Sequence, residues 1–162
     1  MTVRLRLRHE SVEAGANTKS KKENQNGTGE RQMKYILLMS STKAGVEGYH
    51  AWSKQDIEAH MAVLQRINKE LTESGEFVAT QGLAEPREAK VVRGEKNGLP
   101  VTDGIFPESK EFLLGYWIVD VATPERACAI AAKISAAPGP GRVPTNIPIE
   151  VRQFATYESK SK

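Results

Sequence analysis

The chain has 162 residues, of which 39% are hydrophobic and 27% are charged, and its formal net charge is +3. It contains no apolar stretch near the ~20 residues that a membrane-spanning helix needs, and its composition is not that of collagen, a coiled coil or a disulfide-rich scaffold. We therefore expect one globular domain with no membrane partner.

The N-terminal 32 residues carry the whole charge imbalance. They hold seven Lys or Arg and four Glu, whereas residues 33–162 are neutral overall. Residues 10–32 contain almost no large apolar side chain, so residues 1–32 are predicted to be a disordered extension, with a second short tail at 158–162. Met33 begins the first sustained apolar run, and one hypothesis is that translation starts there. A neutral body lacks the basic surface that phosphate binding requires, and we expect no nucleic-acid partner.

The cysteine content and the N-terminus together predict a cytoplasmic protein. Cys128 is the single cysteine and cannot form an intramolecular disulfide. No apolar signal segment follows the N-terminal arginines. We interpret Cys128 as a small packing residue between Ala127 and Ala129, with no base beside it to generate a thiolate.

The domain expected over residues 33–157 begins with Tyr35 to Met39, an apolar run typical of a buried central strand. A loop is expected from Ser40 to Trp52. Ser53 is the predicted N-cap of a helix that ends before Gly75, with an acid three residues after the cap. The predicted apolar face of this helix consists of Ile57, Met61, Leu64, Ile67 and Leu71.

Five further strands and a second helix follow in the sequence. The strands are expected over residues 77–83, 89–93, 99–102, 113–121 and 149–154. Asn97-Gly98 predicts a hairpin turn between the second and third of these strands. Thr123-Pro124-Glu125 has the N-cap, proline and acid that are typical of a helix start. Residues 137–148 are too rich in proline and glycine for regular structure.

This order, β-α-β-β(hairpin)-α-β, predicts a ferredoxin-like α+β sandwich with an extra hairpin. Both helices would cover one face of the sheet. The other face would remain apolar and open, and self-association into a homodimer would cover it.

One stretch of the sequence carries a family resemblance. Residues 103–111 read Asp-Gly-Ile-Phe-Pro-Glu-Ser-Lys-Glu, and after them come Gly115-Tyr116, a strand ending in Asp120 and Val121, and Ile149-Glu150-Val151-Arg152. Over residues 33–154 this pattern resembles the DGPF-type branch of the YCII-related family. Ile105 replaces the proline of the family motif, and Gln153 replaces a proline after the last arginine.

The resemblance implies a small bacterial protein whose ferredoxin-like protomers pair into a dimeric α/β barrel. It also implies a lyase or isomerase that acts on a small organic molecule in a dimer cleft, with a His–Asp pair as the active site. A fold does not by itself establish a function. The alternative is a non-catalytic ligand-binding or regulatory accessory protein.

Four ionisable side chains gather between residues 103 and 111: Asp103, Glu108, Lys110 and Glu111. Two interpretations of this loop remain open. The groups could bond one another, with Asp103 forming a turn. Alternatively, Asp103 could be a general base or polar anchor, while Glu108, Lys110 and Glu111 line the ligand cleft.

His60 lies at the edge of the apolar face of the first helix. It is either a half-buried packing residue or the partner of Asp103 in a proton-transfer dyad. Tyr116 and Trp117 must point to opposite faces of their strand, so one should face the helices and the other the ligand cleft. Tyr49, His50 and Trp52 form either a lid over the cleft or a surface loop anchored by aromatic rings.

No cofactor or metal site is expected. The sequence has no cysteine pair and no cluster of His, Asp or Glu at metal-ligand spacing. Gly139-Pro140-Gly141 lacks the following Lys-Ser/Thr of a phosphate loop. A small-molecule ligand and a second copy of the chain are the expected partners.

Overall fold

The computed structural model describes residues 33–94, 100–104 and 110–155, with the backbone alone for 100–104. The predicted disordered segments, 1–32 and 158–162, lie outside the described residues. The elements in chain order are β1 (Met33–Thr42), α1 (Lys43–His50), α2 (Lys54–Glu73), β2 (Phe77–Gly82), η1 (Pro86–Glu88), β3 (Lys90–Gly94), β4 (Pro100–Gly104), β5 (Glu111–Val121), α3 (Pro124–Ser135), η2 (Pro140–Arg142) and β6 (Ile149–Gln153).

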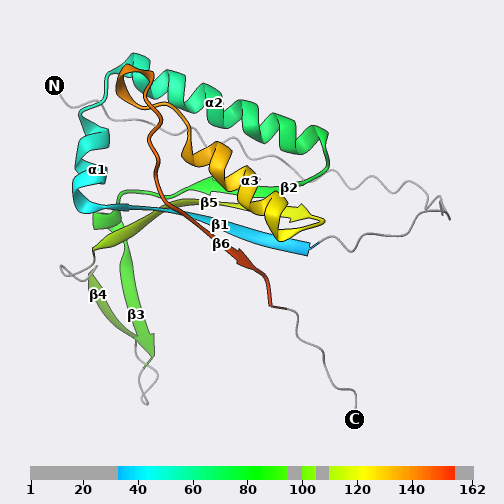
Figure 1. Ribbon diagram of the computed structural model, residues 1–162. Coiled ribbons are helices and arrows are strands. Elements are labelled where there is room, and N and C mark those ends of the chain that lie inside the picture. The colour runs from blue at the N-terminus through cyan, green and yellow to red at the C-terminus, as the bar shows by residue number, and fades with distance from the viewer. Residues whose placement is uncertain (1–32, 95–99, 105–109, 156–162) are drawn as a thin grey trace, which may run out of the picture.

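Four strands form one antiparallel sheet in the order β2-β5-β1-β6. Helix α2 connects β1 to β2, and α3 connects β5 to β6, and each connection passes over one intervening strand. Both helices cover the same face (Figure 1). This arrangement confirms the predicted ferredoxin-like α+β fold.

The predicted helix boundaries are confirmed in atomic detail. Ser53 Oγ accepts a hydrogen bond from the Asp56 backbone N–H at 3.1 Å. The Asp56 carboxylate accepts from the Ser53 hydroxyl at 2.6 Å, so it does not complete a reciprocal capping box with the Ser53 backbone. Gly75 has φ +75°, a left-handed conformation that glycine adopts without strain at a helix C-terminus. Thr123 caps α3 and Pro124 is its first residue.

The core lies between the sheet and the two helices. Leu37, Val119 and Ile134 are each 0% exposed. Helix α3 presents small side chains to the sheet, which lets its axis lie close to the strands. The buried residues of α3 are Ala127, Ile130, Ala131 and Ile134.

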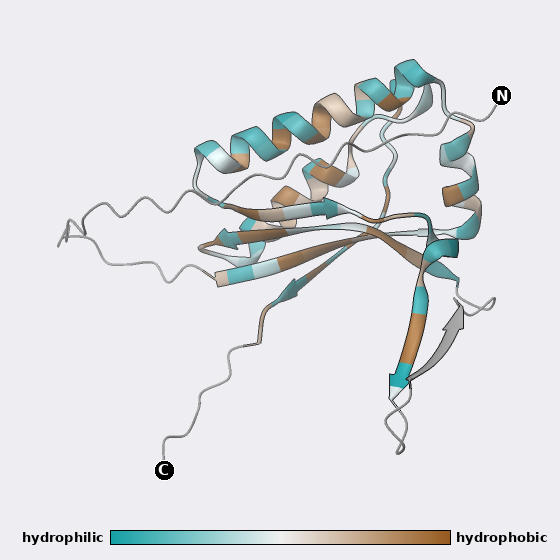
Figure 2. Cartoon of the chain, turned by 180° about the vertical axis from the view of Figure 1, so that it is seen from behind, coloured by the Kyte–Doolittle hydropathy of each residue, from teal (hydrophilic) through white to brown (hydrophobic). Residues whose placement is uncertain are grey.

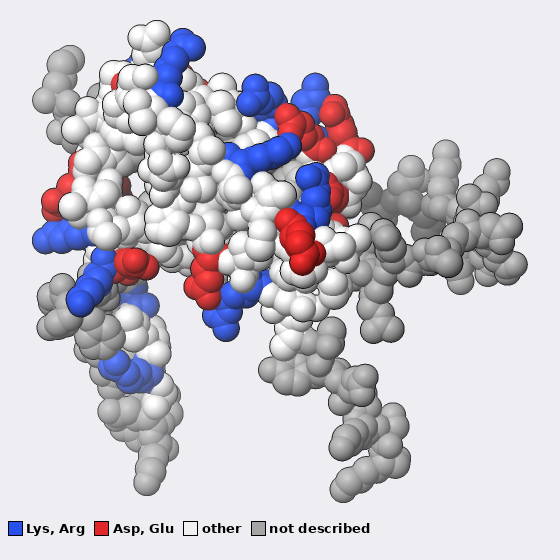
Figure 3. Space-filling view, viewed as in Figure 1, with Lys and Arg blue, Asp and Glu red and all other residues white. Residues whose placement is uncertain are grey.

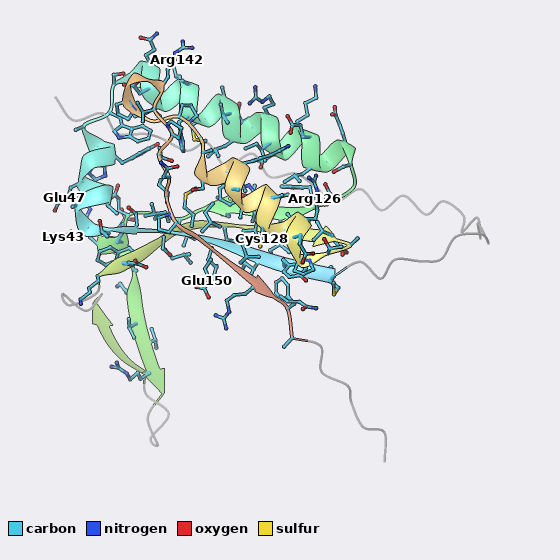
Figure 4. All side chains as sticks on the ribbon, viewed as in Figure 1. Lys43, Glu47, Arg126, Cys128, Arg142 and Glu150 are labelled. Carbon is cyan, nitrogen blue, oxygen red and sulfur yellow. The ribbon has the colours of Figure 1, made fainter. Side chains whose placement is uncertain are left out.

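The other face of the sheet is the one that the helices leave uncovered. It carries Ile36, Leu38, Tyr116 and Ile118, each only partly buried, because they alternate with the core residues of β1 and β5. Figure 4 shows Glu150 on this side of β6. We call the surface formed by Ile36, Leu38, Tyr116 and Ile118 the open face.

Strands β3 and β4 form the predicted hairpin and pair antiparallel, with Val91 opposite Asp103. The predicted turn, Asn97-Gly98, lies outside the described residues. Figures 1 and 2 both show the hairpin extending away from the sheet, on the side opposite α2 and α3. Its strands pair with each other and pack little against the rest of the described chain.

Two predictions were wrong. Residues 43–50 form a helix, α1, rather than part of a loop, with Thr42 as its N-cap. Cys128 is exposed rather than packed in the core. Cys128 directly follows Ala127, whose side chain points into the core. Successive side chains on a helix point in different directions, so the Cys128 side chain of α3 points outward.

No helix among the described residues has the length and apolar character needed to cross a membrane. Figure 3 shows Lys and Arg interspersed with Asp and Glu on the visible face. Several of these charges are i,i+4 pairs along α2, such as Arg66 with Glu70 and Lys69 with Glu73. Such exposed pairs contribute little to stability individually.

Candidate functional site

A cavity of about 470 Å³ lies on the helix side of the sheet, under α1 and the middle of α2. This volume is within the range of small-molecule sites, roughly 300–1,000 Å³. The lining residues are Met39, Val46, Tyr49, His50, His60, Met61, Leu64, Asn68, Thr80, Gln81, Gly82, Leu83, Ala84, Glu85, Pro86, Leu114, Gly115, Trp117 and Ile147. Most of them are apolar. We call this space the helix-side cavity.

Two glycines and a bulge keep this part of the sheet hollow. Gly82 of β2 lies directly opposite Gly115 of β5, so neither strand places a side chain there. A Cβ on Gly115 would lie 2.9 Å from the carbonyl oxygen of Gln81. The β1–β5 register also shifts between Met39 and Ser40, which turns Leu114 toward the helix side of the sheet.

His60 is the most buried polar side chain of the described residues, with 5% exposure, and it lines this cavity. Its Nδ1 lies 3.0 Å from the carbonyl oxygen of Pro138. A carbonyl oxygen only accepts, so Nδ1 carries the proton and donates it. In the neutral ring Nε2 is then a hydrogen-bond acceptor.

The described residues provide no hydrogen-bond partner for Nε2 of His60. Asp120 Oδ1 is the one fully buried side-chain oxygen or nitrogen without a partner in the described chain. His60 Nε2 therefore keeps some accessible surface, and His60 belongs to the wall of the helix-side cavity. The Trp52 ring meets His60 edge-on at 5.4 Å and fixes the plane of the imidazole.

The mouth of the helix-side cavity lies between α1 and the segment that follows β2. His50 Nε2 is 2.7 Å from Glu85 Oε1, and this pair joins the end of α1 to that segment. Tyr49 packs against Trp52 with a centroid distance of 4.9 Å. Burial raises the pKa of the Tyr49 phenol, so this group stays protonated at neutral pH and can donate a hydrogen bond.

Trp117 and Tyr116 point to opposite faces, as predicted. Trp117 faces the helices, lines the helix-side cavity and donates from Nε1 to Asn68 Oδ1 at 2.9 Å. Tyr116 lies on the open face. Because an indole N–H only donates, the atom of Asn68 that faces Trp117 is the amide oxygen.

A second cavity, also about 470 Å³, shares a wall with the first. The shared residues are Tyr49, Leu114 and Ile147. It is lined mainly by the irregular segment 138–148, and Glu111 lies at its edge. Its polar groups converge less than those around His60.

The charged loop is only partly described. The side chain of Asp103 and the whole of Glu108 lie outside the described residues. Lys110 is exposed, and exposed Glu111 begins β5 opposite Thr42. The His60–Asp103 dyad therefore stays a prediction. The group that orients His60 through Nδ1 in the described chain is the Pro138 carbonyl.

Five contributors to the site were missed at the sequence level: Asn68, Gly82, Glu85, Gly115 and Pro138. The aromatic and histidine cluster at residues 49–52 was noticed. Tyr49 and His50, at the end of α1, line the helix-side cavity, and Trp52 lines the second cavity. No three His, Cys, Asp or Glu side chains of the described residues gather as a metal site.

Two comparisons with known proteins agree with this fold. The family described as the YCII-related domain matches residues 33–141. An uncharacterized Rhizobium meliloti protein, R00369, is 32% identical over 108 residues, which cover 67% of this chain and 83% of that protein. The matched segment contains the sheet strands β1, β2 and β5 and all the helices around the cavity. The chain belongs to the YCII-related domain family.

Proposed function

We propose that the chain binds a small organic molecule in the helix-side cavity and transfers a proton to or from it through His60, as a lyase or isomerase. One observation carries this proposal: Nδ1 of the cavity-lining His60 is held by Pro138 at 3.0 Å, while its Nε2 is accessible and has no partner among the described residues. A backbone carbonyl that fixes the tautomer is a common way to orient a histidine for proton transfer.

Tyr49 supports the same chemistry from the other side of Trp52. Its phenol has an ordinary pKa of 10.0, which burial raises further, so it is protonated at neutral pH, and it lines the same cavity. An acceptor and a donor in one apolar space are what a proton relay between two positions of a ligand needs. His60 is the proposed base and Tyr49 the proposed hydrogen-bond donor.

The four methionines provide an internal test of binding. Met39 and Met61 line the helix-side cavity, whereas Met33 lies at the start of β1 and Met1 lies outside the described residues. A methyl-labelled methionine spectrum, recorded against a library of small carbonyl compounds, alcohols and phenols, should show ligands that move the Met39 and Met61 signals and leave Met33 in place. A library in which nothing moves these two signals selectively would refute the proposed site.

Catalysis is then tested with the ligands that bind. A positioned base contributes about 10²- to 10⁴-fold, so His60→Asn should retain binding of the ligand body and lose turnover by that factor. Asp103→Asn tests the predicted dyad in the same assay. Turnover equal to the unaltered chain would remove Asp103 from the chemistry and leave His60 acting with Pro138.

A second candidate function is non-catalytic binding, as in a regulatory accessory protein. It is favoured by the neutral orienting group, since the described partner of His60 Nδ1 is a carbonyl and not a carboxylate. Binding without any turnover of the ligands that the methionine signals identify would establish this alternative.

We also propose a homodimer that covers the open face, as in the DGPF-type branch of the family. Ile36, Leu38, Tyr116 and Ile118 make a partly exposed apolar strip, and the hairpin extends past it. An isolated two-stranded hairpin is marginal in water and gains stability from a surface to pack on. A second copy of the chain supplies that surface. As a separate proposal, the cytoplasm is the compartment of this protein.

Sedimentation of the full chain at micromolar concentration tests the dimer. Ile118→Arg places a charge in the strip and should give a monomer. The matched control, Val143→Arg, lies on a loop where the side chain is already 64% exposed, and should not change the sedimentation coefficient. A monomer in the unaltered chain, or a dimer that survives Ile118→Arg, would contradict this interface.

A further inference from the structure

The hydrogen-bonding state of His60 restricts what the cavity can hold. Nδ1 donates to the Pro138 carbonyl, so the nitrogen that faces the cavity in the neutral ring is an acceptor. An acceptor requires a donor on the ligand. A carbonyl, ether or ester group placed at Nε2 would leave two acceptors facing each other, and neither would be satisfied.

The charges around the cavity restrict the ligand further. No Lys or Arg lines it, as far as the described residues show. Glu85 is its one described carboxylate, and His50 already lies 2.7 Å from it. A carboxylate or phosphate ligand would meet no Lys or Arg at this site, so its charge would be balanced only by protonation of His60, and a buried anion without a partner is strongly disfavoured.

Most of the remaining wall is apolar and partly aromatic, and its Thr80 and Gln81 side chains donate to backbone carbonyls. Met39, Leu64, Leu114 and Trp117 face the cavity from three different elements. Burying an apolar ligand surface against such side chains contributes about 25 cal/mol per Å². The body of the ligand is therefore expected to be hydrophobic, and its polar part to be confined to one end.

From these observations we infer that the helix-side cavity selects an uncharged, largely apolar molecule whose hydroxyl group, a phenol, enol or alcohol, donates a hydrogen bond to His60 Nε2. This inference rests on the proposed function only in requiring that the cavity binds a ligand. It excludes carboxylic acids and phosphates as the preferred class. It does not depend on turnover.

Three probes of one shape test the inference: 2-naphthol, 2-methoxynaphthalene and 2-naphthoate. They share the apolar body and differ in the polar end, which is a neutral donor, a neutral group without a donor, and an anion. Titrations at neutral pH, followed by the Met39 and Met61 methyl signals with Met33 as reference, give the three dissociation constants. We expect 2-naphthol to bind best, about three- to tenfold more tightly than 2-methoxynaphthalene, the usual effect of one hydrogen bond. The carboxylate should bind least.

Two variants assign the preference to a single atom. The amide nitrogen of an asparagine lies close to the position of Nδ1, so His60→Asn retains a donor for Pro138 and removes the Nε2 acceptor. The amide oxygen of a glutamine reaches the position of Nε2, so His60→Gln retains an acceptor there. The preference for 2-naphthol over 2-methoxynaphthalene should disappear in His60→Asn and return in part in His60→Gln.

The outcomes separate this inference from the proposed function. Selective binding with equal affinity for 2-naphthol and 2-methoxynaphthalene, or with 2-naphthoate as the tightest probe, would overturn the ligand class and leave a binding cavity. A preference that persists in His60→Asn would overturn the role of Nε2. No selective shift with any probe at millimolar concentration would overturn both proposals. The comparison in the unaltered chain needs no variant, so it holds even if a variant fails to fold.

Discussion

The two ends of the helix-covered sheet face differ in how they are filled. At one end, Leu37, Val119 and Val121 are essentially unexposed, and α3 packs small side chains against them. At the other end, Gly82 faces Gly115, and the space between sheet and helices is the cavity. The same strands, β1 and β5, run through both ends. One sheet therefore supplies both the stable core and the candidate site, and the Gly82–Gly115 pair lies at the end that forms the cavity.

The helices differ between the two ends in the same way. Helices α2 and α3 bury apolar residues at the filled end. Helix α1, by contrast, buries none of its residues, all of which are described. A helix that buries nothing adds little to the free energy of unfolding. Besides its contacts with β1, α1 makes the Tyr49–Trp52 packing and the His50–Glu85 pair, and Tyr49, His50 and Glu85 all line the cavity. Helix α1, which lies over the cavity, is therefore the α-helix of the described fold with the least buried surface.

The largest expected difference between the two ends is the response to a truncated leucine. Leu37→Ala leaves a void in the filled end, where the side chain is 0% exposed, and should lower the free energy of unfolding by about 3–5 kcal/mol. Leu64→Ala enlarges a space that already exists and should lower it by about 1–2 kcal/mol. Urea unfolding of both variants measures the contrast. Equal losses would mean that the cavity closes in solution.

Substitution at the glycine pair should have an intermediate effect on the free energy of unfolding, and Gly82 provides the matched control for Gly115. A Cβ on Gly115 would lie 2.9 Å from the Gln81 carbonyl oxygen, which belongs to backbone and cannot turn aside, so β2 and β5 must shift apart. Gly115→Ala should lower the free energy of unfolding by about 1–3 kcal/mol. Gly82→Ala meets nothing within 4 Å and should change it by no more than about 0.5 kcal/mol. Similar losses for the two variants would show that the close approach at Gly115 is absent.

The smallest effect concerns an ion pair at the filled end. Arg126 donates to Glu76 from Nε at 2.7 Å and from Nη2 at 2.6 Å, and these bonds hold the pKa of Glu76 below its usual value of 4.5. Because the folded pKa is the lower one, the contribution is complete above pH 4.5 and is lost as the pH falls through the folded value. Arg126 is 41% exposed, so we expect about 1 kcal/mol or less.

Glu76→Gln isolates this contribution from those of the other carboxylates. The unaltered chain should be more stable than the variant at pH 7, and the difference should shrink as the pH falls below 4.5. Thermal melting of both proteins across this range is the measurement. A difference that stays constant with pH would show that Glu76 acts through packing and not through its charge.

Local signals explain why most of the fold could be predicted from the sequence. Ser53 and Thr123 cap their helices through bonds three residues away, and Gly75 ends α2 in a conformation that few other residues adopt. The strands follow their apolar alternation, and β3 and β4 pair as predicted. Each of these features is decided within one short segment of chain.

The parts that could not be predicted depend on residues far apart in the sequence. The partner of His60 is Pro138, which is 78 residues away, and the cavity exists because Gly82 meets Gly115 across two strands. Helix α1 contains Gly45 and Gly48 and buries nothing, so it has no periodic apolar pattern to reveal it. His60 was recognised as a candidate, but its free nitrogen could be seen only once the Pro138 carbonyl was placed.

The central position of β1 also sets the order in which the chain can fold. This first strand pairs with β5 on one side and with β6 on the other, and Tyr35 lies opposite Gln153. During synthesis β1 must therefore leave the ribosome long before either neighbour exists. Such distant pairing slows folding and leaves an apolar strand unpaired in the meantime. Of the four sheet strands, β6 is made last and completes the sheet, so the pairing of β6 with β1, rather than formation of the helices, should be the step that commits this domain to its native state.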